Sequence, residues 1–79
     1  MQVKAKLHAS LRRYLPPGAE GDWVTVELAP GATVADLLDR LGIPKDYAKM
    51  CVVEGEQTTM DRVLAPGSSV ALFPPLAGG

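Results

Sequence analysis

TVADLLDRLG, residues 33–42, is the stretch that decides the fold, because it predicts the clearest helix in the chain. Its apolar residues follow the spacing i, i+3, i+4, i+7 and so share one side of a helix: Val34, Leu37, Leu38 and Leu41. Thr33 and Asp36 approximate a capping box, and Gly42 suits the residue after the last turn. A helix with one apolar side needs a second layer to cover it.

The second layer is predicted to be a sheet, because extended segments flank the helix on both sides. The expected strands are residues 2–9, 24–28, 50–54, a short piece near 57–59, and 69–73. The first two are expected to form a hairpin whose connection holds a helical turn over 10–15, begun by Ser10. Another helical turn is expected near 61–64. This order predicts an α+β fold in which one mixed sheet of four to five strands curls around one main helix.

Length and composition indicate a single globular domain. The chain has 79 residues, of which 47% are hydrophobic and 22% charged, and its net charge is −1. That charge gives no bulk electrostatic reason to expect nucleic acid or an anionic membrane as a partner. No secretory leader and no membrane-spanning run is recognisable, so a cytoplasmic location is expected.

The reactive side chains do not form a catalytic or metal-binding constellation. His8 is the only histidine, and no cysteine or aspartate lies near it in sequence, so an exposed surface imidazole is expected. Cys51 is the only cysteine and lies in an apolar run, which predicts a buried thiol and excludes an internal disulfide. No metal site is predicted, and no autonomous active site.

The last seven residues, FPPLAGG (73–79), carry the strongest functional signal. Pro74 and Pro75 each fix φ and favour a stiff, extended stretch, whereas Gly78 and Gly79 lack a Cβ and suit a narrow channel. The apolar strand leads into the prolines without a polar linker. This arrangement favours a tail that delivers the Gly79 carboxylate into another protein, over a frayed terminus.

Four segments, in this order along the chain, resemble the MoaD/ThiS sulfur-carrier family. They are the first strand leading into Leu11-Arg12, PGATVADLL (30–38), PGSSVALF (66–73) and the ending PPLAGG (74–79). The Phe-Pro-Pro-x-x-Gly-Gly ending looks like the MoaD branch, the small subunit of molybdopterin synthase. The resemblance implies a ubiquitin-like β-grasp domain over residues 1–73 and a flexible diglycine tail over residues 74–79.

The resemblance also implies a chemistry for the tail. In the family, an ATP-dependent activating enzyme adenylates the terminal glycine carboxylate, and sulfur then replaces AMP to give a thiocarboxylate. Gly79 would carry the sulfur, and the inserted segment would be Pro74, Pro75, Leu76, Ala77 and Gly78. No cofactor would be bound stably, since ATP is used by the activating enzyme. The acceptor partner would be the large subunit of molybdopterin synthase or a thiazole synthase.

The docking surface for such partners is expected on the open face of the sheet beside the tail. Phe73 must face outward if Leu72 faces the helix, because neighbouring residues of a strand point to opposite faces. His8 stands where MoaD proteins often present a large apolar residue to the partner, so the partner's identity is the point in doubt. Met60 and Leu64 are further candidate neighbours.

Four functions remain open on the sequence. The first is a sulfur carrier for molybdopterin synthesis, and the second is the same chemistry for another product, such as thiamine thiazole, cysteine or a thiolated tRNA. The third is a ubiquitin-like modifier joined through Gly79 to lysines of target proteins. The last is a binding module with an inert tail.

Overall fold

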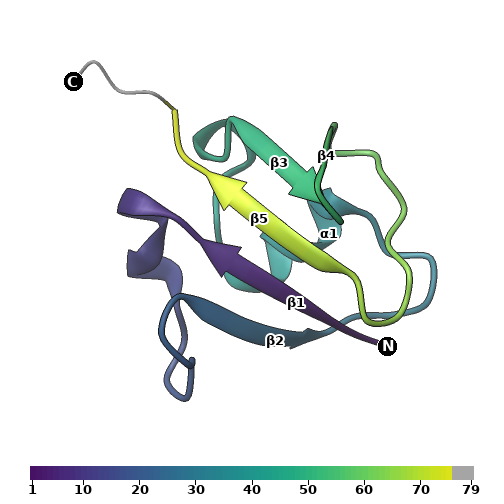
Figure 1. Cartoon of the computed structure of the whole chain (residues 1–79), viewed down its shortest axis with the longest axis horizontal. Coiled ribbons are helices and arrows are strands. Elements are labelled where there is room, and N and C mark those ends of the chain that lie inside the picture. Colours follow the sequence, from purple (N-terminus) through teal and green to yellow (C-terminus); the bar gives the residue numbers. More distant parts are fainter. Residues whose placement is uncertain (76–79) are drawn as a thin grey trace.

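The computed structural model describes residues 1–75, which form one mixed sheet with a single α-helix on one face (Figure 1). The elements are β1 (Gln2–Leu7), η1 (Ala9–Tyr14), β2 (Trp23–Glu27), α1 (Val34–Leu41), η2 (Lys45–Tyr47), β3 (Met50–Val53), β4 (Glu56–Thr58) and β5 (Ser69–Phe73). Both η elements are 3-10 helices. The predicted α+β class, with one main helix against a mixed sheet, is confirmed.

The sheet has five strands in the order β2-β1-β5-β3-β4. The central strands β1 and β5 run parallel, with Leu7 opposite Leu72, and every other neighbouring pair is antiparallel. The hairpin predicted from the first two strands is present, and its connection contains η1. Because β5 lies between β1 and β3, the strand that leads to the tail is held on both sides (Figure 1).

The main helix begins and ends as its residue types predict. The Thr33 side chain accepts a hydrogen bond from the Asp36 backbone N–H at 3.4 Å, and the Asp36 carboxylate accepts one from the Thr33 N–H at 2.8 Å. At the other end Gly42 has φ 78°, a left-handed conformation that glycine adopts without a steric penalty.

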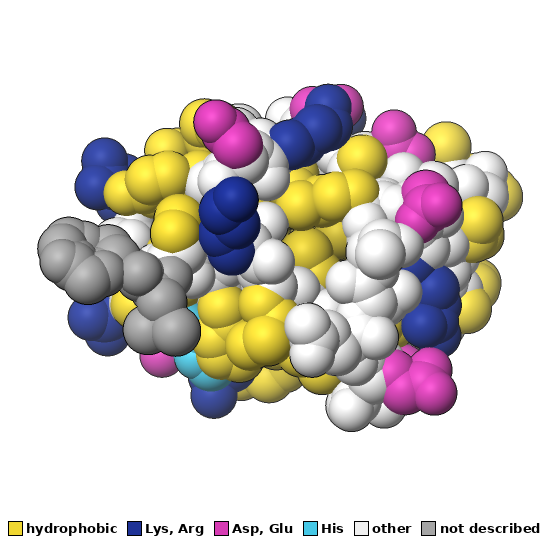
Figure 2. All heavy atoms as spheres, turned by 90° about the horizontal axis from the view of Figure 1, so that it is seen from above, with side chains coloured by type: hydrophobic (Ala, Val, Ile, Leu, Met, Phe, Trp, Pro, Cys, Tyr) yellow, Lys and Arg dark blue, Asp and Glu magenta, His cyan; other side chains and the backbone are white. Residues whose placement is uncertain are grey.

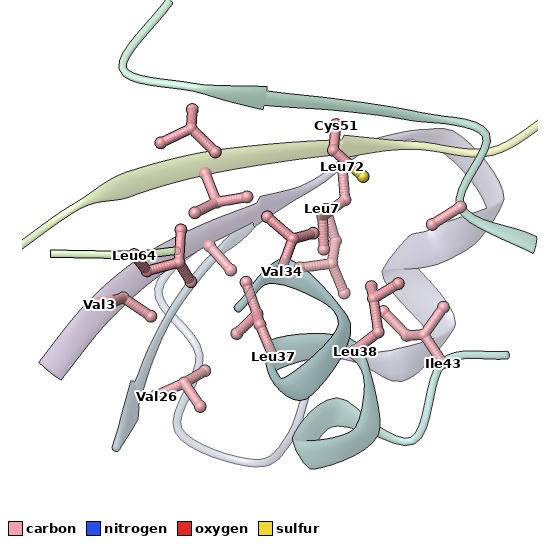
Figure 3. Packing of buried hydrophobic residues seen from close by; sticks show 14 of the residues in the cluster. Val3, Leu7, Val26, Val34, Leu37, Leu38, Ile43, Cys51, Leu64 and Leu72 are labelled. Carbon is pink, nitrogen blue, oxygen red and sulfur yellow. The ribbon is translucent and has the colours of Figure 1, made fainter. Parts of the chain in front are cut away.

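The core lies between α1 and the inner face of the sheet (Figure 3). Leu37 and Leu38 from α1 are fully buried, as are Leu7 and Leu72 from the two central strands. Leu41, the last apolar residue of the helix, packs against this cluster but is only half-buried. Among the described residues no helix covers the opposite face of the sheet, so the outward side chains of β1 and β5 lie on an open surface (Figure 1).

Two local predictions are wrong, and one short helix was not predicted. Residues 61–64 form no helical turn; the backbone turns at 60–61, and Val63 then pairs with Thr33 in an isolated bridge. The first strand ends at Leu7 instead of residue 9, and Ala9 is exposed with φ 51°. The sequence analysis missed η2, although Pro44 before it and Asp46 in its first turn are typical of a helix start.

Within residues 1–75, none of the helices has the length and apolar character that crossing a lipid bilayer requires.

Candidate functional site

A stacked pair of rings lies at the base of the tail. One ring belongs to His8, the residue after β1, and the other to Phe73, the last residue of β5. The ring centroids lie 4.1 Å apart and the ring planes differ by 12°. The two residues come together because Leu7 and Leu72 are opposite each other in the parallel pair and both point into the core. The following residues of the two strands therefore point to the open face.

Backbone hydrogen bonds fix the position of this pair. The His8 N–H donates to the Leu72 carbonyl at 3.1 Å, and the Lys49 N–H donates to the Phe73 carbonyl at 2.9 Å. Met50, the first residue of β3, is the register partner of Phe73 on the other side. The end of β5 is thus hydrogen-bonded to the residue after β1 and to the residue before β3. The outward orientation predicted for Phe73 is confirmed, since Leu72 is buried and Phe73 is half-buried.

A left-handed residue ends β1 immediately after His8. Ala9 has φ 51°, which brings the chain out of the strand and into η1, while His8 itself keeps an extended backbone. Ser10 therefore does not begin the helical turn as predicted, since His8 occupies the residue position that precedes η1 and no side chain caps it. His8 is also half-buried by the stack, which corrects the expectation of an exposed imidazole.

A surface hollow lies beside the ring pair, where the chain leaves the sheet. It is lined by residues from three segments of the chain: His8, Ala9, Ser10, Lys49, Met50, Phe73, Pro74 and Pro75. Pro74 and Pro75 are half-buried there. We call His8, Met50 and Phe73 the docking surface, because this is where a partner is proposed to bind. Nothing in the sequence analysis identified Met50 or Lys49, because their place beside Phe73 depends on the pairing of β3 with β5.

The other predicted site residues fall into two groups. Leu76, Ala77, Gly78 and Gly79 lie outside the described residues, so their roles and the boundary between domain and tail stay predictions. Leu64 is buried in the core and cannot belong to an outer docking surface, which corrects that suggestion. Met60 is half-buried and packs against the core cluster.

The electrostatic surroundings favour a neutral imidazole at the docking surface. Partial burial lowers the pKa of His8 below its usual value, the nearby Lys6 ammonium lowers it further, and Asp22 opposes these two effects. A neutral ring stacks on Phe73 without the desolvation cost of a charge.

The described residues contain one buried thiol and no cluster of metal ligands. Cys51 is buried as predicted, and burial raises the pKa of its thiol, which disfavours the reactive thiolate. Within residues 1–75, histidine, cysteine and carboxylate side chains form no group of three that would hold a metal ion.

One helix on a five-stranded mixed sheet with central parallel strands defines a ubiquitin-like β-grasp protein, and the comparisons with known proteins confirm that class. A family model described as Mut7-C ubiquitin matches residues 1–77, and the chain belongs to this family. No curated protein sequence matches the chain significantly.

Solved structures support the same fold. SAMP1 from Haloferax volcanii matches with 29% identity over 100% of both chains and a TM-score of 0.73. A Pyrococcus furiosus protein assigned as molybdopterin converting factor, subunit 1, matches with 28% identity, covering 95% of this chain and 98% of its own, and a TM-score of 0.70. The resemblance to the MoaD-type carriers is thereby confirmed.

The Haloferax volcanii protein HVO 2177 covers 100% of this chain and 87% of its own, with a TM-score of 0.71. At 22% identity it supports the fold alone.

Proposed function

We propose that this protein is a sulfur carrier whose Gly79 carboxylate is activated by an ATP-dependent adenylating enzyme and converted to a thiocarboxylate. The observation that carries the proposal is the position of Phe73. It ends a central strand that is hydrogen-bonded on both sides, and it stacks on His8 where the chain continues into Pro74 and Pro75. A rigid surface directly before a diproline and a diglycine suits the capture of a tail by a partner.

The chemistry follows from the weak electrophilicity of a carboxylate. An oxygen of the Gly79 carboxylate attacks the α-phosphorus of ATP, and pyrophosphate leaves. A hydrosulfide-level sulfur nucleophile then attacks the acyl carbon, the new C–S bond forms, and the C–O bond to AMP breaks. The product keeps its sulfur on the protein, so no free sulfide is released.

Molybdopterin synthesis is the leading pathway in this proposal. Support comes from the Phe-Pro-Pro ending and from the match to the protein assigned as molybdopterin converting factor, subunit 1. The partners would be an adenylating enzyme and a large synthase subunit that accepts the tail. A thiazole synthase is the corresponding acceptor if the carrier serves thiamine.

A second candidate is a ubiquitin-like modifier, joined through Gly79 to lysines of other proteins. The specific support is the match to SAMP1, a small archaeal modifier protein by name, which covers the whole of both chains. Both candidates use the same acyl-adenylate, and they differ in whether sulfide or a lysine amine displaces AMP.

The deciding experiment is intact-mass spectrometry after incubation with the adenylating enzyme, ATP and sulfide. If the protein is a carrier, its mass increases by the difference between a sulfur and an oxygen atom. The control is a truncated chain that ends at Gly78, whose mass should not change. Tryptic peptides in which a lysine carries residues 63–79 as a branch would identify a modifier instead, because Arg62 is the last trypsin site before Gly79. An unchanged mass without conjugates would contradict both functions.

A further inference from the structure

Charge is distributed unevenly between the two ends of the sheet. The end at which β5 leaves for Pro74 carries these cations on β1, η1, η2 and the residue before β3: Lys6, Arg12, Arg13, Lys45 and Lys49. The carboxylates of the opposite end are Glu27, Asp36, Glu54, Glu56 and Asp61. In Figure 2, Lys and Arg side chains flank the side from which the tail emerges, and most acidic side chains lie toward the other side.

The cations at the tail end are only partly neutralised. Lys45 is paired with Asp39 at 3.0 Å, and Arg12 is 3.9 Å from Asp22. Within residues 1–75, Lys6, Arg13 and Lys49 have no carboxylate at ion-pair distance. We call these three residues the basic rim. Two residues of the rim are close to the docking surface in the chain, since Lys6 precedes His8 by two residues and Lys49 directly precedes Met50.

The Arg13 guanidinium lies beside two aromatic rings. Its guanidinium carbon lies 6.0 Å from the ring centroid of Tyr14 and 5.6 Å from that of Tyr47. Its Nη2 donates a hydrogen bond to the Tyr47 hydroxyl at 3.3 Å, and the two tyrosine rings meet edge to face at 6.4 Å. This cluster joins η1 to η2, the two short helices beside the base of the tail.

An oriented guanidinium is suited to bind a carboxylate. Arginine presents five N–H donors in a planar fork, and Arg13 gives one of them to Tyr47. Because the ring contacts already restrict the side chain, less conformational entropy is lost when a partner carboxylate binds. Lys6 is restrained in a similar way, with its Nζ 5.8 Å from the centre of the half-exposed Trp23 ring.

We infer that the basic rim recognises an acidic protein surface, which places carboxylates on Arg13 and Lys49 while it covers His8 and Phe73. The inference rests on the proposed function, in which an adenylating enzyme docks at the base of the tail, and it names the chemistry of that partner. Charged groups at the edge of an interface steer association and set its salt dependence, while the apolar centre supplies affinity.

A nucleic-acid partner fits this surface less well. Nucleic-acid interfaces are strongly and continuously positive, whereas here Asp22, Asp39 and Asp46 lie among the cations and the whole chain has a net charge of −1. The centre of the surface is also apolar, formed by the stacked rings and Met50. Discrete partner carboxylates match three separated cations better than a phosphate backbone does.

The test measures adenylation of the full chain by ATP–pyrophosphate exchange, with the adenylating enzyme of the same organism. Arg13→Glu and Lys49→Glu are expected to raise the KM for this protein at least about fivefold, with kcat within about twofold. The KM of Arg13→Lys should lie between those of the wild type and Arg13→Glu, because lysine keeps the positive charge but lacks the planar set of N–H donors of the guanidinium. The matched control is Arg62→Glu at the opposite end, where Arg62 is 3.4 Å from Glu56, and its KM should stay within about twofold of the wild type.

Two outcomes of this assay are distinct. Normal exchange with an unchanged KM in Arg13→Glu and Lys49→Glu would overturn the inference and leave the carrier function intact. Lack of exchange with the wild-type protein would count against the proposed function. In that case the inference is tested by direct binding of an acidic peptide to the wild-type protein. Circular dichroism melting confirms that each variant is folded.

The direct assay titrates the wild-type protein with a short, end-capped polyglutamate peptide and follows side-chain NMR signals. Saturable shifts of the Arg13 Nε–H signal, lost in Arg13→Glu and weakened by added salt, support the inference. A titration without shifts at Arg13 and Lys49 would overturn it. Tighter binding of a single-stranded oligonucleotide than of polyglutamate, abolished by the same substitutions, would also overturn it in favour of nucleic acid.

Discussion

His8 and Phe73 stack face to face across the two parallel central strands, with ring centroids 4.1 Å apart. The stack lies on the outer face of the sheet, at the point where the chain continues into Pro74 and Pro75. The imidazole, which lies against Phe73 in nearly parallel planes, adds a second flat ring to this surface.

The stack should contribute a measurable coupling energy. A double-mutant cycle with His8→Ala and Phe73→Ala is expected to give a coupling of about 0.5–1.5 kcal/mol in the free energy of unfolding, as measured for aromatic pairs. Urea denaturation of the four proteins provides the numbers. Additive losses would show that the two rings do not interact in solution.

Phe73→Ala should weaken binding of the adenylating enzyme by more than about 1 kcal/mol, because Phe73 is the largest apolar side chain at the base of the tail. Its own stability loss should be small, since the side chain is half-buried on the outer face. Titration calorimetry and thermal melting separate these effects. A collapse of stability without a specific loss of binding would place Phe73 in the core.

The pH dependence of stability should carry a contribution from His8. The pKa of folded His8 is lowered, so the unfolded chain binds the proton more readily. This contribution is fully present above the unfolded pKa of about 6.5 and is lost as pH falls through the folded pKa. NMR titration of the imidazole gives the folded pKa directly. His8→Gln should flatten the stability profile over this range, and a folded pKa above that of a model peptide would contradict the sign.

Leu38→Ala should destabilise the fold by about 2–5 kcal/mol, because Leu38 is fully buried between α1 and the sheet. Leu41→Ala is the matched control in the same helix. Leu41 is half-buried, so its truncation should cost clearly less. Equal losses for the two variants in urea denaturation would contradict the described packing.

Ala9→Gly should stabilise the protein by about 0.5–1 kcal/mol, because Ala9 has φ 51° and glycine adopts that conformation without a Cβ clash. Ala35→Gly within α1 makes the same chemical change at a helical position. It should destabilise by about 0.5–1 kcal/mol. Changes of the same sign at both positions would show that Ala9 is not left-handed in solution.

Gly78→Val should block adenylation while the melting temperature stays unchanged. The argument rests on residue type, since a β-branched side chain restricts the backbone and widens the chain where a narrow enzyme channel is proposed. Pyrophosphate exchange measures the effect, with Ala77→Val as a neighbouring control of smaller expected effect. An undiminished exchange rate would show that the channel admits a branched side chain.

Much of the fold was predictable because its signals are local. The spacing of Leu37 and Leu38, the Thr33–Asp36 box and Gly42 each act within a few residues, and all three appear as expected. The alternation of strand residues likewise fixed the outward position of Phe73. The predicted helical turn at 61–64 failed because pairing of Val63 with Thr33 outweighed a weak local preference.

What the sequence by itself determined is the helix, the alternating strands and a diglycine ending whose chemistry suggests a carrier. Only the tertiary structure decided which side chains surround the tail. The parallel pairing of β1 with β5 brings His8 onto Phe73, and the contact of η1 with η2 places Arg13 beside Tyr47. The two residues of each pair are far apart in the chain, and periodicity describes only near neighbours. Their meeting depends on strand order and register, which the burial of the whole core selects.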